Sequence, residues 1–458
     1  MRRIVYIPIE KKHRELMSKL LVALELVAHD IAVVIGYSRA LFANAKNLPS
    51  GLMYLKGMNR VQNDVIRQLP GIGHLPIACD EEALGASGQM LVKDCWHEAQ
   101  PLMAKVFCQG QEQHDALMRE RGFTADQLTI TGNPRIDLLR RPFVDAWANE
   151  ASDIVQKHGS FVLINTDMSG TNNQFHDLDY YREVLIQVGW LDPNSPDDQV
   201  LLNDHLRHDR ANMEAIDAFV RAMRDSLPDQ KIVLRPHPSE DDRRWRDLAS
   251  TAGNLTIVSN TETVPWLLAA RCLVQTGCTT GVEAAVIGTP AIGLIMGAED
   301  NPFSKYRLSN RVNPLVTSIR AAIDAVHSLL RKPNASITTG ETRISLAPYL
   351  DIADDKYAFE KTARELERML PPAGFDIEKV LRPIPVSVDR HLKSTFSQSA
   401  LTEGFSNFSE IQSRIDALFK VTPSIDWSRP TVRDLDWGLY ALLPKAQMSS
   451  QLGDRAST

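Results

Sequence analysis

The chain has 458 residues, of which 43% are hydrophobic and 24% are charged, with 24 Gly and 25 Pro. This composition excludes collagen-like, disulfide-scaffold and wholly disordered proteins, and the length predicts two or three domains. Lys and Arg number 51 against 57 Asp and Glu, so the net charge is −6. An acidic balance argues against a surface that binds nucleic acid, and any anion site must therefore be local.

The cysteines are five in number: Cys79, Cys95, Cys108, Cys272 and Cys278. They form no C-x-x-C pair and no Cys/His spacing of a zinc site, so we expect no metal and a reducing compartment. The N-terminus lacks the apolar core and cleavage site of a signal peptide. The most apolar long stretch, residues 20–37, is interrupted by Glu25, His29 and Asp30. A membrane-spanning helix is therefore not expected, and the sequence predicts a cytoplasmic protein.

Short apolar runs alternate with amphipathic stretches along the first 150 residues. The runs end in Gly, Pro, Asn or acidic residues, as buried parallel strands do. They comprise residues 4–8, 31–35, 52–55, 75–79, 105–108 and 128–131. Residues 11–28 and 114–121 carry apolar side chains at spacings of three and four, which is typical of helices. The alternation predicts a doubly wound, Rossmann-like α/β domain over residues 1–150.

The same alternation restarts after a charged amphipathic stretch at residues 142–158. The predicted strands are 161–165, 231–235, 255–258, 272–275 and 290–295, and the predicted helices are 210–224, 240–252, 263–270 and 280–287. This pattern predicts a second Rossmann-like domain over residues 151–335. Residues 167–209 are polar and are predicted to form a long connection, of a kind that is usually functional or mobile.

From residue 336 the pattern weakens. Residues 357–369 and 409–419 are predicted to be helical, and residues 448–458 are small and polar and are expected to fray. Residues 336–458 are therefore predicted to be a partly helical C-terminal extension. It can cap the second domain, cross back to the first, or bind a partner. Two doubly wound domains in series predict a cleft lined by the carboxyl ends of their strands.

A His-Pro motif follows the predicted strand at residues 231–235. Its sequence is Arg235-Pro236-His237-Pro238, and the two prolines fix an extended turn that holds Arg235 and His237 at the strand end. A histidine fixed there can donate to a phosphate. A histidine in a proline-rich turn can also be purely structural, and we favour the functional interpretation.

A glycine- and threonine-rich turn follows the predicted strand at residues 272–275. Thr276 and Gly277 begin it, and Thr279 and Thr280 stand where the next helix starts. Hydroxyls and free N–H groups at a helix start can bind a phosphate, which the helix dipole also favours. Glu283, one turn on, can accept hydrogen bonds from ribose hydroxyls. An ordinary capping box made by a threonine and Glu283 is the structural alternative.

Acidic residues end a strand in the first domain. Asp80, Glu81 and Glu82 are adjacent, and a carboxylate at a sheet edge can act as general base or nucleophile. An acidic turn at a helix start is the structural alternative. Other strand-end loops offer groups that can bind a sugar or an acceptor: Glu10, Arg14, Asn133, Arg135, Thr166 and Asp167.

Together these features resemble a GT-B glycosyltransferase, which has two facing Rossmann-like domains. Glu81-Glu82-Ala83 and His237-Pro238 are similar to the acidic and His-Pro motifs of bacterial sialyltransferases and related Kdo transferases, which use CMP-activated sugar acids. Residues 79–82 and 131–137 also resemble surface carbohydrate biosynthesis proteins of bacterial polysaccharide loci. Ala83 stands where the motif has glycine, so the choice between Glu81 and Glu82 stays open.

The resemblance implies a transferase that moves a Kdo- or sialic-acid-like sugar from CMP to a glycan or glycolipid. Arg235, His237, Thr279 and Thr280 would bind the departing phosphate. Glu82, or Glu81, would deprotonate an acceptor hydroxyl or attack the anomeric carbon. Arg14 or Lys11 would pair with the carboxylate of the sugar. A donor with one phosphate needs no metal, so no cofactor is expected. Peripheral contact with the cytoplasmic face of the inner membrane would fit a glycolipid acceptor.

Three alternatives remain open. A CDP-glycerol-type glycerophosphotransferase also carries a His-Pro motif, and would need a second catalytic histidine, for which His13 and His74 are candidates. A UDP-sugar 2-epimerase would need several acids around the sugar. A non-catalytic nucleotide-sugar or glycan-binding protein would keep the scaffold without the chemistry.

Overall fold

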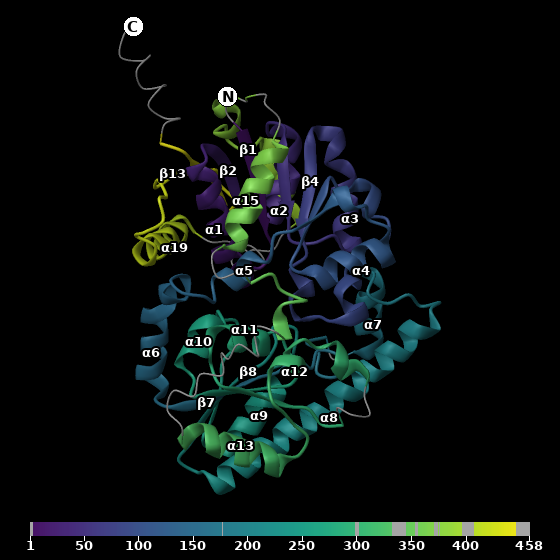
Figure 1. The fold of residues 1–458 in the computed structure, drawn as a ribbon, viewed down its shortest axis with the longest axis vertical. Helices are drawn as coiled ribbons and strands as arrows, with labels where there is room; N and C mark the ends of the chain where they lie inside the picture. The colour runs from purple at the N-terminus through teal and green to yellow at the C-terminus, as the bar shows by residue number, and fades with distance from the viewer. Residues whose placement is uncertain are drawn as a thin grey trace. The chain divides into compact units, whose positions relative to one another are not determined.

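The computed structural model describes residues 3–175, 177–297, 302–331, 345–352, 356–370, 374, 376–395 and 407–445. The chain divides into two compact units (Figure 1). Unit 1 comprises Met1–Glu81, Cys95–Ala146 and Leu350–Thr458, and unit 2 comprises Glu82–Asp94 and Trp147–Tyr349. Each unit thus takes in segments that lie far apart in the sequence.

Unit 1 is built on an eight-stranded sheet in the order β13-β14-β2-β1-β3-β4-β5-β6. Its strands are β1 Arg3–Ile9, β2 Ile31–Tyr37, β3 Gly51–Leu55, β4 His74–Cys79, β5 Lys105–Cys108, β6 Leu128–Ile130, β13 Thr431–Asp434 and β14 Leu439–Leu443. Strands β1 to β6 are parallel, and β14 joins β2 in antiparallel register, with Ala441 opposite Val34. The first six strands form the buried parallel sheet expected of apolar runs linked by helices.

The helices of unit 1 come from both ends of the chain. They are α1 Lys12–Ala28, α2 Ser38–Asn44, α3 Arg60–Gln68, α4 Gln111–Arg121, α5 Pro134–Asp137, α15 Ala358–Met369, α16 Ile377–Val380, α17 Val386–Thr395 and α19 Phe408–Val421. Helix α15 lies beside α1 (Figure 1). Glu367 of α15 binds Arg3 at 2.9 Å and His29 at 2.8 Å, so charge as well as packing holds α15 to the start of the chain.

Unit 2 contains a parallel six-stranded sheet in the order β12-β11-β10-β7-β8-β9. Its strands are β7 Phe161–Asn165, β8 Lys231–Arg235, β9 Leu255–Ile257, β10 Cys272–Gln275, β11 Ala291–Leu294 and β12 Leu315–Val316. Counted along the chain, this is the 3-2-1-4-5-6 order of a Rossmann fold. The order reverses between β7 and β10, and that point is where such sheets bind ligands.

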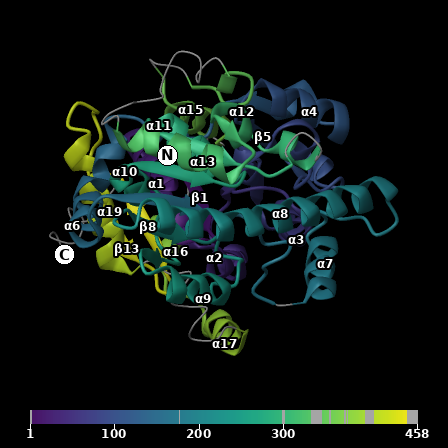
Figure 2. The same ribbon diagram turned by 90° about the horizontal axis from the view of Figure 1, so that it is seen from below.

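The helices of unit 2 cover both faces of its sheet. They are α6 Ala148–His158, α7 Leu178–Gln187, α8 Pro196–Ser226, α9 Arg243–Ala252, α10 Val264–Ala269, α11 Thr280–Ile287, α12 Ser309–Val312 and α13 Ile319–Arg331. Alternate strand residues such as Val162 and Ile164 pack against α8, α9 and α13, while Phe161 and Leu163 pack against α6, α10 and α11. Figure 2 shows the length of α8. This two-sided burial explains why the strands are apolar throughout.

The expected α/β class with two Rossmann-like domains is confirmed, and most predicted strands lie within a residue or two of their observed ends. The expected connection over residues 167–209 is wrong, because α7 and the first half of α8 occupy most of it. The expected domain boundary is near residue 150, and the chain passes from unit 1 to unit 2 between Ala146 and Trp147. Of the expected C-terminal extension, residues from Leu350 onward belong to unit 1, where β13 and β14 extend the sheet. The end at residues 448–458 lies outside the described residues.

Candidate functional site

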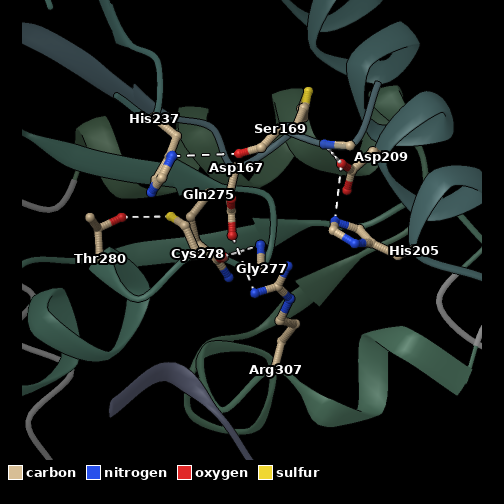
Figure 3. A network of polar contacts seen from close by, with 12 residues as sticks. Asp167, Ser169, His205, Asp209, His237, Gln275, Gly277, Cys278, Thr280 and Arg307 are labelled. Atoms are coloured by element: carbon tan, nitrogen blue, oxygen red, sulfur yellow. Dashed lines mark hydrogen bonds and ion pairs between the residues drawn. The ribbon is translucent and has the colours of Figure 1, made fainter. Parts of the chain in front are cut away.

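The candidate site lies in unit 2, where loops leave the carboxyl ends of β7, β8 and β10. These loops carry Asp167, His237 and Gly277, which the sequence singled out separately and which the fold brings together (Figure 3). β7 and β10 are neighbours in the sheet, and the strand order reverses between them. Their loops therefore leave the sheet at the switch point, which is where such sheets bind ligands.

His237 is held in one orientation by Ser239. The Oγ of Ser239 lies 2.6 Å from Nδ1 of His237, and the backbone N–H of Ser239 donates to the same nitrogen at 3.3 Å. The Oγ of Ser169 lies 2.6 Å from that of Ser239. Since a backbone N–H can only donate, Nδ1 is an acceptor and the proton of the neutral ring is on Nε2. The half-buried ring therefore presents an N–H donor.

The side chain of Glu240 joins the loops after β7 and β8 through hydrogen bonds. Its Oε1 accepts from Thr166 Oγ1 at 2.7 Å, from the N–H of His237 at 3.1 Å and from the N–H of Met168 at 3.1 Å. Its Oε2 accepts from Trp245 Nε1 at 3.0 Å. Thr166, expected to bind sugar, thus donates its hydroxyl to this buried carboxylate. The sequence reasoning missed Glu240, although its place three residues after His237 is a signal for such a role.

The turn after β10 has the shape that a glycine permits. Gly277 has φ +94° and its N–H donates to Oε1 of Gln275. Helix α11 then starts at Thr280, whose Oγ1 lies 2.7 Å from Sγ of Cys278. Thr279 makes no side-chain capping bond, so the capping box considered from the sequence is not formed. Glu283 lies in the first turn and is buried.

Asp167 faces a group of basic side chains. Its Oδ2 lies 3.2 Å from Nη1 of Arg307, whose guanidinium lies over the ring of Phe303 at 4.7 Å. Burial by itself raises the pKa of Asp167, but Arg307 and nearby histidines, His237 among them, hold that pKa below its usual value. Asp167 therefore stays ionised beside Arg307. No signal in the sequence marked Arg307, because it approaches the site from a separate loop.

Three polar residues of α8 line the same region. His205 stacks on Phe303 with ring centres 4.5 Å apart, and its Nε2 lies 3.2 Å from Oδ2 of Asp209. Oδ2 of Asp209 also accepts from the N–H of Gly170 at 2.8 Å. His208 is 2% exposed, and burial lowers its pKa to about 4, so its ring is neutral at neutral pH. Polar residues at positions 205, 208, 209 and 212, the spacing of a buried helix stripe, were the signal missed.

The acidic motif divides between the two units. Glu81 belongs to unit 1 and is buried, with Oε1 at 3.4 Å from Nζ of Lys19. Burial raises its pKa, against the effect of Lys19. Glu82 is exposed and belongs to unit 2. The short helix that it begins, Glu82–Gly85, lies against the start of α11: a Cβ on Gly85 would stand 2.5 Å from Oγ1 of Thr279.

Unit 1 holds the other predicted residues of the acceptor side. Glu10 is exposed and forms an ion pair with Lys56, and Arg14 is half-buried in the first turn of α1. Asn133 caps α5 by accepting from the N–H of Arg135 at 3.0 Å. The charge of Arg135 acts on Glu81, so these two predicted residues lie near each other.

The guanidinium of Arg235 binds the loop after β9. Its Nη2 donates to the carbonyl oxygen of Thr261 at 2.6 Å, and Nη1 donates to Oγ1 of Thr263 at 3.4 Å. Burial lowers its pKa to about 10. Pro238 is exposed, and Thr276 is buried, with a hydroxyl that has no partner in the described part of the chain.

Within the described residues, no three His, Cys, Asp or Glu side chains come together in a group able to hold a metal ion. Of the described helices, none is both long enough and apolar enough to span a membrane. No protein-family model matches the chain, and no curated protein matches it in sequence.

Several solved structures are similar to the chain. HepE from Anabaena, in complex with UDP and glucose, is 12% identical over 80% of this chain and 99% of its own, with a TM-score of 0.44. A UDP-N-acetylglucosamine 2-epimerase described as putative, from Listeria monocytogenes, is 13% identical over 82% and 99%, with a TM-score of 0.47. The wall teichoic acid polymerase TagF, soaked with CDPG, is 10% identical over 80% and 88%, also at 0.47. These likenesses are too distant to assign a role to any residue.

Proposed function

We propose that the chain is a glycosyltransferase that transfers a Kdo- or sialic-acid-like sugar from a CMP-activated donor to a glycan acceptor. One observation carries the proposal. The acidic segment Glu82–Gly85 and the threonine turn before α11, almost 200 positions apart in the sequence, lie against each other in unit 2. This approach supports a reaction centre with the carboxylate of Glu82 on one side and an anion seat at the threonine turn on the other, as group transfer from a nucleotide requires.

The phosphate of CMP would be bound at the start of α11. The dipole of α11 favours an anion there, although the N–H groups of Gly281 and Val282 already donate to the carbonyl oxygens of Cys278 and Thr279 at 3.1 and 2.9 Å. The hydroxyls of Thr279 and Thr280 add donors there. Glu283, buried in the first turn, would accept from the ribose hydroxyls.

His237 would stabilise the phosphate as it departs. Its Nδ1 is occupied by Ser239, so Nε2 carries the proton and can donate to the phosphate oxygen on which negative charge develops. Glu240 keeps the loop in place through the N–H of His237. The ring N–H group of His237 that donates to the phosphate is thus fixed before the reaction and needs no rearrangement.

Glu82 would be the general base. Glu81 is buried beside Lys19, whereas Glu82 is exposed on the segment that reaches Thr279. In the transfer step, the acceptor hydroxyl gives its proton to Glu82 and its oxygen bonds to the anomeric carbon. The bond from that carbon to the phosphate oxygen breaks, and its electron pair leaves with CMP.

Nucleotide binding gives the first test. In a thermal-shift series with CMP, CDP and UDP, we expect CMP to stabilise the protein. Stabilisation by UDP alone would overturn the CMP assignment and favour an epimerase-like protein. Preference for CDP would favour a glycerophosphotransferase. His74, one candidate for the second histidine of that class, is fully buried with Nε2 2.9 Å from the carbonyl oxygen of Ala45.

Turnover gives the second test. Glu82→Gln and His237→Gln should each lower the release of CMP from a CMP-sugar by roughly 10²- to 10⁴-fold at an unchanged melting temperature. Glu112→Gln and His97→Gln, at exposed positions of unit 1, are the matched controls and should leave turnover unchanged. Full turnover in both site variants would refute the assigned roles. CMP binding without turnover in the wild-type chain would indicate a binding protein.

A further inference from the structure

A second group of polar side chains adjoins the Gly277 turn and has no part in the mechanism above. It consists of Asp167, His205, His208, Asp209 and Arg307 around the ring of Phe303. Figure 3 shows Asp167, His205, Asp209 and Arg307 of this group. Several of its atoms are buried and lack a hydrogen-bond partner within the described residues: Nδ1 of His205, both ring nitrogens of His208, Oδ1 of Asp209 and Nε of Arg307. Such atoms are costly unless water or a ligand pairs with them.

This group of polar side chains contacts the turn at Gly277. A Cβ placed on Gly277 would lie 3.3 Å from Cγ of Arg307 and 3.5 Å from Nε2 of His208. Both side chains therefore flank the backbone that leads into α11. The phosphate seat and this group share one turn, so a ligand at the first can reach the second.

Arg307 is fixed for recognition of an anion. Its guanidinium lies 4.7 Å from the centre of the Phe303 ring, which His205 covers as well, and its Nη1 meets Asp167 at 3.2 Å. A guanidinium held over a ring in this way presents paired N–H donors that match two oxygens of a carboxylate or phosphate. Asp167 occupies one donor and leaves Nε buried without a partner.

We propose that Arg307 and His208 form a subsite for a second anionic group of the donor, next to the phosphate bound by α11. This inference rests on the proposed function. A CMP-activated 2-keto sugar acid bears its carboxylate on the same carbon as the phosphate oxygen, so its two anions are neighbours. A nucleoside diphosphate offers its second phosphate in a similar place. Both are oxyanions that an arginine binds through two oxygens.

The test measures the affinity of four proteins for CMP, CDP and a CMP-activated sialic acid by calorimetry. The proteins are the wild type, Arg307→Gln, His208→Leu and the control Arg311→Gln. Arg311 lies on the same segment, over the ring of Tyr349, with a hydrogen bond to the carbonyl oxygen of Lys305. If Arg307→Gln does not fold, Arg307→Lys retains the charge but not the paired donors.

We expect Arg307→Gln to weaken the ligand with two anions about 10- to 100-fold, and His208→Leu to weaken it less, while CMP changes about twofold or less. Arg311→Gln should change none of the affinities. If Arg307→Gln loses affinity for the CMP-activated sialic acid, the group bound at the subsite is the carboxylate of the sugar. If it loses affinity for CDP alone, the group bound there is a second phosphate. The latter result overturns the sugar-acid donor but keeps the subsite. Equal weakening of every ligand, or of none, overturns the subsite, and a wild-type chain that binds none of them overturns both proposals.

Asp167→Asn gives a test of opposite sign. The carboxylate of Asp167 repels an incoming anion and competes for Arg307, so its neutral amide should tighten binding of the two-anion ligand severalfold. CMP affinity should change less. Weaker binding of the two-anion ligand in this variant would contradict the inference, because Asp167 would then be needed to hold Arg307 in place.

Discussion

His208 combines burial with two unpaired ring nitrogens. It is 2% exposed, packs against Phe303 and has a pKa of about 4, well below the ordinary value of 6.5. Leucine has a similar volume and no polar atoms. We expect His208→Leu to raise the free energy of unfolding by about 1 kcal/mol, because it removes the desolvation cost of the ring. Denaturant unfolding at pH 7.5 measures this change, and a loss of several kcal/mol would show that the ring has partners in the folded chain.

The same residue predicts a dependence of stability on pH. In the folded chain the ring stays neutral down to about pH 4, whereas in the unfolded chain it takes up a proton near pH 6.5. Above about pH 6.5 the ring is neutral in both states and protonation has no effect on stability. As the pH falls from 6.5 toward 4, only the unfolded chain takes up the proton, so the free energy of unfolding decreases by roughly 3 kcal/mol in all. Comparison of wild type with His208→Leu across this range isolates the effect, and identical pH profiles would exclude it.

Lys19 is a buried cation that lies between two carboxylates, those of Glu15 and Glu81. It is 2% exposed, with Nζ at 3.6 Å from Glu15, 3.4 Å from Glu81 and 3.1 Å from the carbonyl oxygen of Pro8. Lys19→Met would leave two buried carboxylates without their cation and should cost about 3–5 kcal/mol of unfolding free energy.

The double variant Lys19→Met with Glu81→Gln should recover part of that loss, since one of the two carboxylates becomes neutral. Lys157→Met, on the exposed side of α6, is the control and should change stability by less than about 0.5 kcal/mol. No recovery in the double variant would show that Lys19 acts through packing alone. In that event the charge of Lys19 would not be needed to keep the Glu81 carboxylate buried.

At the scale of single elements, the turn between β10 and α11 depends on Gly277. Its φ of +94° and the 3.3 Å approach of Arg307 to a Cβ disfavour any side chain there. We expect Gly277→Ala to lower stability by about 1–2 kcal/mol and to weaken CMP binding as well. Gly122→Ala is the matched control, because Gly122 has φ +71° with nothing within 4 Å. It should lower stability only, and unchanged CMP affinity in Gly277→Ala would remove the turn from the site.

The strands and α11 could be predicted because their apolar side chains recur with the period of the element. The first half of α8 could not, because polar residues occupy its inner face and break the apolar period. His237 and the turn at Gly277 were predictable for a local reason: proline and glycine fix their shape. Arg307 and Lys19 were not, since their importance comes from side chains that reach them from distant segments.

At the scale of the whole molecule, β14 completes unit 1 by pairing with β2. The N–H of Tyr37 donates to the carbonyl oxygen of Gly438 at 3.1 Å, and a Cβ on Gly36 would lie 1.9 Å from that oxygen. Gly36→Ala should therefore displace β13 and β14 and destabilise unit 1, with unit 2 unchanged. Hydrogen exchange resolved by peptide should show faster exchange at residues 439–443, and unaltered protection there would contradict the expected displacement.

The membership of the C-terminal residues in unit 1 was beyond sequence patterns. Residues 439–443 are apolar enough to be a strand, but nothing local says that their partner lies 400 positions earlier. Glu367 likewise gains its meaning from Arg3 and His29. Periodicity identifies an element and its buried face, whereas pairing across hundreds of residues is decided by the complete fold.

The late arrival of β14 has a consequence for synthesis on the ribosome. Strand β2 emerges early, and its edge has unpaired N–H and C=O groups until residues 439–443 have been made. Most of unit 2 is one continuous segment, Trp147–Tyr349, that leaves the ribosome in the meantime. The nascent chain thus carries an open sheet edge through most of translation. Chaperones that shield exposed strand edges would act on this protein before β14 pairs with β2.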